Sequence, residues 1–425
     1  MLGLAIIADD ITGAADTGVK ALPAFAPVYL LDHRFLSRAT LEPPPGAVSV
    51  FTSSRGLAPA AAGRLAFAVG RSLRASHPQR VYKKIDSALR GHIGAELEAV
   101  MEALELPLSF IAPAFPEQGR TTVGGIHHIH GVPVAETEMR RDPVTPVTES
   151  SLPKWIGGQT RFSVAQVGLE TMEAGVEAIA GQIERLRSAG ARHITFDATR
   201  PLHLEHIAAL ALNRYPQALL CGSAGLACGL VRQLPQERPP EPAAAGAGIR
   251  LGEGRFLFVC GSASEMLRRQ VGELARGAPV AIEALEPAAL LSGEEPGASA
   301  GRFDRAVAAL SGSDLALQLA PPVRGTRVVD SQELVIKFAE FAAAAIARVK
   351  AAGLFLSGGD TALAVFEQIE VSAVRLEREL SSGLVYGTLS GGPLSGRPVV
   401  TKAGSFGRPE TLLELHRLLR PTKPS

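Results

Sequence analysis

Two adjacent carboxylates follow the first apolar segment of the chain, in the sequence IIADDI at residues 6–11. The apolar residues predict a buried strand and the residues after Asp10 predict a helix, so one of the two aspartates is expected to cap that helix. A cap requires only one carboxylate. The other aspartate is therefore a candidate general base or ligand-binding group, and the sequence does not say which of the two has this role.

A second cluster of charged side chains begins at the end of the predicted strand Val81–Lys84, in the sequence KIDSALR. Lys83 and Lys84 are neighbours on this strand and must point to opposite faces, so at most one of them serves a common site. Arg90 offers a planar fork that fits a carboxylate or a phosphate. The alternative is that Asp86 and Arg90 only form an ion pair on a surface loop.

Two other segments of the first half carry polar side chains. The sequence FTSSRG is a third polar strand end and contains Arg55. A hairpin predicted at Ile126–Thr137 carries His127, His128 and His130, but no cysteine or pair of acids completes a set at the spacing of a zinc site. Surface histidines on a hairpin are therefore favoured over a metal centre.

Three strand-to-helix turns in the second half are rich in glycine and serine: Gly261–Ser264, Ser357–Thr361 and Ala403–Gly407. The first N–H groups of a helix are unpaired and lie at the positive end of the helix dipole, which favours phosphate binding. For Ser357–Thr361 alone, the alternative is that Asp360 or Thr361 merely caps the helix. Three such turns together are what a nucleotide crevice at the carboxyl ends of parallel strands requires.

The common motifs of other nucleotide-binding and hydrolytic proteins are missing from the sequence. It has no Gly-Lys pair and hence no P-loop, and no GxGxxG after a strand; its one GxSxG match, GASAG at residues 297–301, does not follow a predicted strand. The number of Lys and Arg residues (43) nearly equals that of Asp and Glu (42), and the sequence has no basic run. We therefore expect neither a nucleic acid nor an anionic membrane as a partner. Three cysteines without a CxxC indicate neither a disulfide framework nor a zinc knuckle.

The chain of 425 residues is long enough for two domains. No apolar run approaches the roughly 18 residues of a membrane helix, and the apolar start has no basic residues before it, so we expect a cytoplasmic protein. Apolar strands alternate with amphipathic helices, including one helix predicted at Glu170–Ser188, which predicts an α/β fold with two domains, each a mainly parallel sheet flanked by helices. The predicted strands are Leu4–Ala8, Val28–Leu31, Val48–Phe51, Val81–Lys84, Phe110–Ala112, Val164–Val167, Ile194–Phe196, Leu219–Cys221, Phe256–Cys260, Val280–Ile282, Leu315–Leu319, Leu354–Leu356 and Val399–Thr401.

A segment rich in Pro, Ala, Gly and Glu interrupts this alternation and predicts an interdomain linker. We place the N-terminal domain at residues 1–235, the linker at 236–252 and the C-terminal domain at 253–425.

The segments IADDITGAAD, YKKIDSALRGHIGAE, IAPAFPEQGRTT, GVPVAETEMRRDPVTPV, LSGGDTA and TKAGSFG resemble the four-carbon acid sugar kinase family, also known as DUF1537. They extend from residue 6 to residue 407 and so cover nearly the whole chain. The resemblance implies transfer of the γ-phosphoryl group of ATP to O4 of D-threonate, D-erythronate or 3-oxo-tetronate. It also implies an N-terminal sugar-acid domain and a C-terminal ATP domain.

The resemblance also implies roles for individual residues. The acid would be held by Asp10, Arg55, Lys84, Ile85, Asp86, Ser87 and Arg90, and ATP by Ser262, Gly358, Gly359, Asp360, Thr361, Gly404, Ser405 and Gly407. The sequences KKIDS and ADTG are closer to the D-threonate and D-erythronate branch. Ala88 and His92 stand where relatives more often carry Thr and Asn, which leaves the identity of the acid open.

We therefore predict a kinase with ATP and Mg²⁺ as its cofactors and a small sugar acid as its substrate. Asp10 and Asp86 are the candidate bases for the attacking hydroxyl, and the magnesium ligands are not specified. Two other hypotheses are a non-catalytic two-lobed binding or sensor protein for sugar acids, and a lyase whose glycine turns are only structural. A homo-oligomer is a further open alternative.

Overall fold

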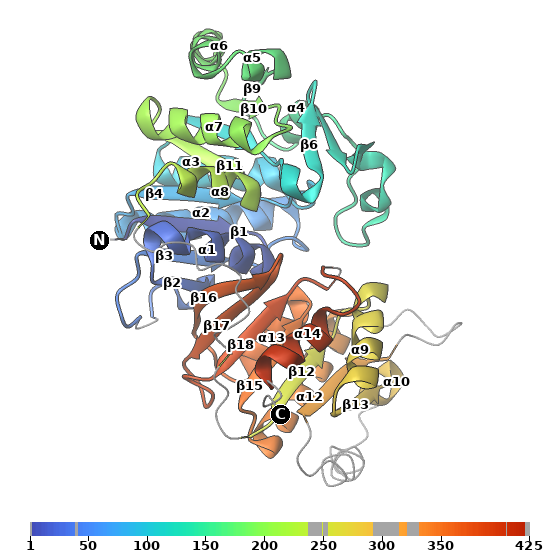
Figure 1. Ribbon diagram of the computed structural model, residues 1–425. Helices are drawn as coiled ribbons and strands as arrows, with labels where there is room; N and C mark the ends of the chain where they lie inside the picture. Colours follow the sequence, from blue (N-terminus) through green and yellow to red (C-terminus); the bar gives the residue numbers. More distant parts are fainter. Residues whose placement is uncertain are drawn as a thin grey trace. The chain divides into compact units, whose positions relative to one another are not determined.

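The computed structural model describes residues 2–38, 41–236, 249, 254–291, 314–320, 331–404 and 406–420. The chain divides into two compact units, Met1–Pro240 and Glu241–Ser425. Both are α/β, as the sequence predicted (Figure 1). Nearly all of the predicted linker at 236–252 lies outside the described residues. In the described part of the chain no helix is long and apolar enough to cross a membrane.

The sheet of the first unit has the strand order β2-β3-β1-β4-β11-β5-β10-β9, and each of these neighbouring pairs is parallel. Its predicted strands are confirmed, with ends that move by one or two residues. Most of these strands are buried along their whole length, as expected when helices cover both faces of a parallel sheet. The strands are β1 (Leu4–Ala8), β2 (Val28–Asp32), β3 (Ala47–Phe51), β4 (Arg80–Lys84), β5 (Leu108–Ala112), β9 (Val164–Val167), β10 (His193–Phe196) and β11 (Ala218–Gly222).

Helices cover the two faces of this sheet in separate groups. Helix α1 packs beside α8 and α8 beside α7, whereas α2 packs beside α3. The helices are α1 (Ile11–Phe25), α2 (Pro59–Ala75), α3 (Ile93–Leu104), α4 (Leu152–Gly157), α5 (Leu169–Glu173), α6 (Val176–Ser188), α7 (Pro201–Asn213) and α8 (Ala224–Arg232), with the 3-10 turns η1 (His33–Phe35), η2 (Pro116–Gln118), η3 (Val134–Glu136) and η4 (Glu138–Arg141).

The structure corrects one local prediction in the first unit and confirms another. The single helix expected at Glu170–Ser188 is wrong: it is two helices, α5 and α6, which separate at Gly175, where φ is +91°. The hairpin expected around Gly131 is confirmed as β7 (Ile126–Ile129) and β8 (Val132–Pro133). It belongs to a small antiparallel sheet that also contains β6 (Arg120–Val123).

The sheet of the second unit has the order β13-β14-β12-β15-β18-β17-β16. The pairs from β13 to β18 are parallel, and β17 pairs antiparallel with both β18 and β16. The five predicted strands are confirmed, while β16 and β17 were not predicted. The elements are β12 (Phe256–Cys260), α9 (Glu265–Gly277), β13 (Val280–Leu285), α10 (Pro287–Leu291), β14 (Asp314–Leu319), α12 (Ser331–Val349), β15 (Gly353–Ser357), α13 (Gly359–Gln368), β16 (Ala373–Ser381), β17 (Leu384–Ser390), β18 (Pro398–Lys402) and α14 (Thr411–Leu419).

Alternating residues of the second sheet face a core beneath α9 and α14. Phe256, Phe258 and Cys260 of β12 all point into it, as the two-residue period of a strand requires. Leucine side chains of α9 and α14, among them Leu274 and Leu415, fill the same cluster. On another part of the sheet, α12 packs beside α13 and α13 against β15. This packing fixes the carboxyl ends of β12, β15 and β18, where the glycine turns begin.

Candidate functional site

The three charged strand ends of the first unit meet because β3, β1 and β4 are parallel neighbours. Arg55, which follows β3, donates from Nε to Asp9 Oδ2 at 2.7 Å and from Nη2 to Asp10 Oδ1 at 2.9 Å. Burial would lower the pKa of Arg55, but Asp10, Asp9 and Asp86 outweigh it and raise that pKa well above its usual range. The guanidinium is therefore a fixed positive charge between two carboxylates.

The two adjacent aspartates have different environments. Asp10 is the N-cap of α1, and its Oδ1 accepts from Gly13 N at 3.2 Å. Asp9 is the carboxylate not needed for capping: it is only 4% exposed, and its Oδ1 is buried and has no hydrogen-bond partner in the part of the chain that the structure describes. Burial raises the pKa of Asp9, but the charge and hydrogen bond of Arg55, with Lys83 and Lys84, bring it below its usual value. The prediction that one aspartate caps the helix is confirmed.

The two adjacent lysines of β4 point to opposite faces of the sheet. Lys83 Nζ lies 2.8 Å from Glu96 Oε2 of α3, and both side chains are almost fully buried. Lys84 Nζ donates to the carbonyl of Ile85 at 2.8 Å and lies beside Gly13 of α1, where an added Cβ would approach it to 2.9 Å. Lys84 is therefore on the side of Asp10, and Lys83 is part of a buried ion pair.

The turn after β4 is closed by one carboxylate. Asp86 Oδ2 accepts from Ala88 N, Arg90 N and Arg90 Nε at 3.2, 3.3 and 2.9 Å, and its Oδ1 accepts from Arg90 Nη2 at 3.1 Å. Arg90 Nη1 also reaches Asp142 Oδ2 at 3.4 Å. Burial would raise the pKa of Asp86, but Arg90, Arg55 and Lys84 hold it far below its usual range. Asp86 is therefore ionised, and its two oxygens together accept four N–H donors.

Side chains from distant parts of the chain hold the carbonyl groups of this turn. Trp155 Nε1 donates to Leu89 O at 3.0 Å, and His127 Nε2 lies 2.9 Å from Ser87 O. His127 is fully buried, so the prediction that it lies on a hairpin surface is wrong. Burial lowers the pKa of His127 to about 4, so it acts as a neutral donor. The spacing of the three histidines could not indicate this contact, because Ser87 belongs to another strand end.

The remaining predicted residues of the acid site are part of the same turn. Ile85 is buried, and its N–H donates to Gly222 O at 2.9 Å while its carbonyl accepts from Lys84. His92, at the N-cap position of α3, places Nε2 2.6 Å from Leu57 O. The structure thus brings together Asp10, Arg55, Lys84, Ile85, Asp86, Ser87 and Arg90 at one edge of the sheet.

The three glycine turns of the second unit also meet, because β12, β15 and β18 are neighbours. Gly358 N donates to Lys402 O at 3.1 Å. A Cβ added to Gly404 would lie only 2.0 Å from Ser262 Oγ, so only glycine fits there. Gly358 has φ of +100° and starts α13 without a side-chain cap. The first N–H groups of α13 are therefore available to an anion.

The carbonyl groups of the loop after β18 are held by three side chains. Lys402 Nζ donates to the carbonyls of Ala403, Gly404 and Phe406 at 2.9, 3.0 and 3.0 Å. Ser264 Oγ donates to Gly404 O at 2.7 Å, and Gln270 Nε2 donates to Phe406 O at 3.0 Å. Lys402 is 1% exposed, and burial lowers its pKa to about 8, although Cys260 acts in the opposite direction. Sequence reasoning did not select Lys402, although it directly precedes the loop.

The predicted nucleotide residues differ in accessibility. Gly358, Gly359 and Asp360 are partly or fully exposed at the start of α13, whereas Thr361 is 3% exposed and packs against Gly261. Among the other predicted residues, Ser262 and Gly404 are in contact, Gly407 has φ of +88°, and Ser405 lies outside the described residues.

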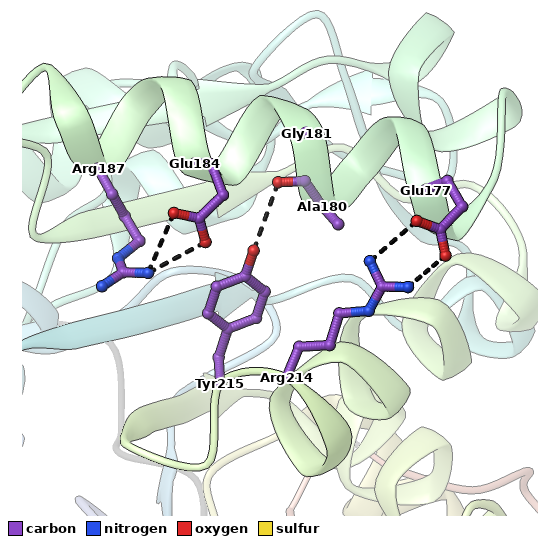
Figure 2. A pocket seen from close by; sticks show the side chains of 7 residues that line it. All are labelled: Glu177, Ala180, Gly181, Glu184, Arg187, Arg214 and Tyr215. Atoms are coloured by element: carbon purple, nitrogen blue, oxygen red, sulfur yellow. Dashed lines mark hydrogen bonds and ion pairs between the residues drawn. The ribbon is translucent and has the colours of Figure 1, made fainter.

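A pocket on the first unit lies between α6 and the end of α7 (Figure 2). Its charged side chains bond within the pocket: Arg214 Nη1 to Glu177 Oε2 at 3.0 Å and Arg187 Nη1 to Glu184 Oε1 at 3.1 Å. Tyr215 Oη donates to Ala180 O at 3.4 Å (Figure 2). None of the residues predicted for the acid or the nucleotide lines this pocket.

The fold thus defines a class of protein with two α/β units. Each unit has a candidate site at the carboxyl ends of its parallel strands. A family model for a sugar-binding N-terminal domain matches residues 4–230, and one for a nucleotide-binding C-terminal domain matches residues 257–412. The chain belongs to the four-carbon acid sugar kinase family (DUF1537).

Relatives with assigned names are similar over nearly their whole length. A D-threonate kinase of Bordetella bronchiseptica is 32% identical, with 98% of this chain and 97% of the relative covered. A D-erythronate kinase of Heliobacterium modesticaldum is 28% identical, with 96% and 94% covered. A crystal structure from Salmonella typhimurium is similar with a TM-score of 0.83 at 25% identity, covering 98% of this chain and 99% of the other.

Proposed function

We propose that this chain is an ATP-dependent kinase that transfers the γ-phosphoryl group to the O4 hydroxyl of a four-carbon acid sugar. The observation that carries the proposal is the contact between the three glycine turns of the second unit, in a chain of this family. The acid would bind in domain 1–235 and the nucleotide in domain 253–425. The names of the relatives support the reaction class.

The proposed nucleotide site depends on backbone N–H groups. Three side chains, those of Lys402, Ser264 and Gln270, donate hydrogen bonds to carbonyl groups of the loop after β18. The phosphates of ATP would then bind the backbone N–H groups, including those at the start of α13. Such donors are fixed before the reaction and need no reorganisation as charge moves in the transition state. This arrangement would replace the P-loop that the sequence lacks.

Magnesium would enter with ATP and neutralise charge on its phosphates. No group of three or more His, Cys, Asp and Glu side chains in the described residues could hold a metal ion. Mg²⁺ bound to a nucleotide commonly uses only one or two carboxylates besides phosphate oxygens and water. Asp360, exposed in the first turn of α13, fits such a single ligand.

We assign the general base to Asp10 rather than Asp86. The oxygens of Asp86 already accept four N–H donors, and its pKa lies far below its usual range, so it is a poor proton acceptor. Among the described residues, Asp10 Oδ2 accepts only from Thr12 Oγ1, at 2.6 Å, and a carboxylate oxygen can accept a second hydrogen bond. Asp86 would instead hold Arg90 and the turn in place.

For the substrate, we rank D-threonate first, D-erythronate second and 3-oxo-tetronate third. The sequence of the Lys84–Arg90 turn supports this order, although relatives of similar identity carry the name 3-oxo-tetronate kinase. The His92 ring nitrogen Nε2 is occupied by Leu57 O, so it does not add a new contact to a sugar hydroxyl.

The position of transfer can be tested by phosphorus NMR of the product formed from ATP and D-threonate. A phosphate on the primary O4 couples to two protons, and one on O2 or O3 couples to a single proton. We expect the O4 pattern. ATP binding without any phosphorylated product would instead support the non-catalytic sensor alternative, and a product phosphorylated on another oxygen would contradict the O4 assignment.

A further inference from the structure

Arg120 is the first residue of β6, in the small sheet that contacts the turn after β4. Its backbone pairs with Phe115 in both directions, at 2.8 and 3.1 Å, and with Ile129 of β7. From β7, His127 contacts the carbonyl of Ser87 in that turn. Arg120 is thus held on a rigid hairpin that is bonded directly to the proposed acid site.

Three arginines lie close enough to Asp86 for their charges to interact with it: Arg55, Arg90 and Arg120. Two of them already form ion pairs with carboxylates of the protein. Arg55 bonds to Asp9 and Asp10, and Arg90 uses Nε, Nη1 and Nη2 on Asp86 and Asp142. A ligand carboxylate would have to compete with these contacts at either residue.

Arg120 differs from these two arginines in its contacts. Among the described residues no carboxylate forms an ion pair with it, and its guanidinium donates only to the carbonyl of Gln118, from Nη1. Its Nε is buried and has no acceptor among the residues that the structure describes. Burial lowers the pKa of Arg120 despite the opposing charges of Asp86 and Glu138, so its positive charge is incompletely compensated. A buried guanidinium N–H without an acceptor is costly, and a ligand carboxylate would relieve that cost.

We propose that Arg120, rather than Arg90, is the residue that binds the carboxylate of the sugar acid; this rests on the proposed function. A guanidinium fork with its Nε–H and Nη–H groups on one edge matches the two oxygens of a carboxylate. Arg90, held by Asp86 and Asp142, is then a positioning residue that shapes the turn.

In the described part of the chain, two other buried polar atoms near this turn have no hydrogen-bond partner. One is Asp9 Oδ1, on the carboxylate that contacts Gly91, where an added Cβ would lie 3.0 Å from Oδ2. The other is Thr145 Oγ1; the backbone N–H of Thr145 donates to Asp142 at 2.9 Å, and Asp142 in turn pairs with Arg90. A carboxylate oxygen and a hydroxyl can both bind a sugar hydroxyl, so these two atoms are further candidate contacts of the proposed ligand.

The test compares the acid with a ligand that lacks the carboxylate. KM values for ATP, for the preferred four-carbon acid and for the matching four-carbon polyol are measured with wild type, Arg120→Gln and Arg120→Lys. We expect Arg120→Gln to raise KM for the acid about 10- to 100-fold, the range of a charge-assisted contact. KM for ATP and for the polyol should stay within about twofold. The KM of Arg120→Lys for the acid should lie between the values of wild type and Arg120→Gln, because lysine keeps the positive charge but not the planar guanidinium fork.

Arg214→Gln is the matched control, because Arg214 is a surface arginine paired with Glu177 and should change none of these constants. An equal change for acid and polyol after Arg120→Gln, or no change, would overturn the proposal while leaving the kinase function intact. If wild type phosphorylates no acid, the proposed function has failed and acid binding is measured by calorimetry instead. Binding by wild type that is lost in Arg120→Gln would then support the Arg120 assignment, and absence of binding by wild type would overturn it.

Discussion

Lys83 Nζ and Glu96 Oε2 lie 2.8 Å apart in the interior of the first unit, with side chains 1% and 2% exposed. Ser54 Oγ donates to the other oxygen of Glu96 at 2.6 Å and is itself 2.7 Å from Thr52 Oγ1. The ion pair therefore connects β4 and α3 to the strand end that carries Arg55. Glu96 and Asp9 together keep the pKa of Lys83 above its usual value although burial opposes this.

Removal of one partner from this ion pair should destabilise the first unit. Lys83→Met or Glu96→Leu leaves an unpaired buried charge and should cost about 3–5 kcal/mol, whereas the double variant should be closer to wild type. Unfolding by urea can be followed by fluorescence of Trp155, the single tryptophan, which lies in this unit. The exposed pair Glu184–Arg187 is the control, and Arg187→Met should change the unfolding free energy by less than about 1 kcal/mol. Equal losses in single and double variants would contradict this prediction.

Gly358 should be sensitive to any side chain. Its φ of +100° is strained for other residues, and Gly358→Ala should distort the start of α13 and weaken ATP binding at least about tenfold. Affinity for the acid should hardly change. Gly272→Ala in α9, where an added Cβ meets open space, is the matched control and should leave both affinities unchanged. Wild-type ATP affinity in a folded Gly358→Ala protein, measured by calorimetry, would remove this turn from the nucleotide site.

Lys402 should make ATP binding sensitive to alkaline pH. The protonated ammonium donates to three carbonyls, and loss of a proton leaves only two N–H donors for them. Because burial lowers the pKa of Lys402 to about 8, KM for ATP should rise as pH increases through 8. Lys402→Met should raise KM for ATP at neutral pH and abolish this rise. The same pH dependence in Lys402→Met would assign it to another group.

The pKa of Lys402 also has a consequence for stability. The pKa is lowered from 10.5, so the folded state binds the proton less tightly than the unfolded state does. Its contribution to stability is therefore complete only above about pH 10.5 and is lost as pH falls through 8. The increase in unfolding free energy of wild type between pH 8 and 10 should be larger than that of Lys402→Met.

His127 should contribute to stability at neutral pH and lose that contribution in acid. Burial, the largest effect, lowers its pKa from 6.5 to about 4. The contribution is therefore complete above pH 6.5 and disappears as pH falls through 4, with a maximum of about 3 kcal/mol. His127→Gln should flatten the stability profile of the first unit in this range and raise KM for the acid, because Ser87 O loses its fixed donor. An unchanged profile would show that the pKa of His127 is the same in the folded and unfolded states, which would contradict this prediction.

The strands made of continuous apolar residues, such as Leu4–Ala8 and Phe256–Cys260, could be predicted from the sequence. Parallel strands that are buried on both faces need such continuous apolar residues. It failed for β16 and β17. In β16 three charged residues, Glu377, Arg378 and Glu379, are consecutive, and the register with β17 shifts there, so the alternation of a half-buried strand is broken. Antiparallel strands need only one buried face, so their signal is weaker.

At the candidate site, the family resemblance grouped Asp10, Arg55 and Asp86 at one acid site, but the sequence did not show how their side chains pair. The parallel order of β3, β1 and β4 is what brings these three strand ends together. That Arg90 is occupied by Asp86 and Asp142, and that His127 is buried against Ser87, depends on contacts between segments far apart in sequence. Such contacts leave no local pattern.

The most direct test of the kinase proposal is ADP release by the purified chain with ATP, Mg²⁺ and each four-carbon acid in turn. We predict turnover of D-threonate and D-erythronate, with kcat/KM for 3-oxo-tetronate lower than for the better of the two. A clear preference for 3-oxo-tetronate would contradict the ranking of substrates. ADP release that no four-carbon acid stimulates would contradict the proposed function itself.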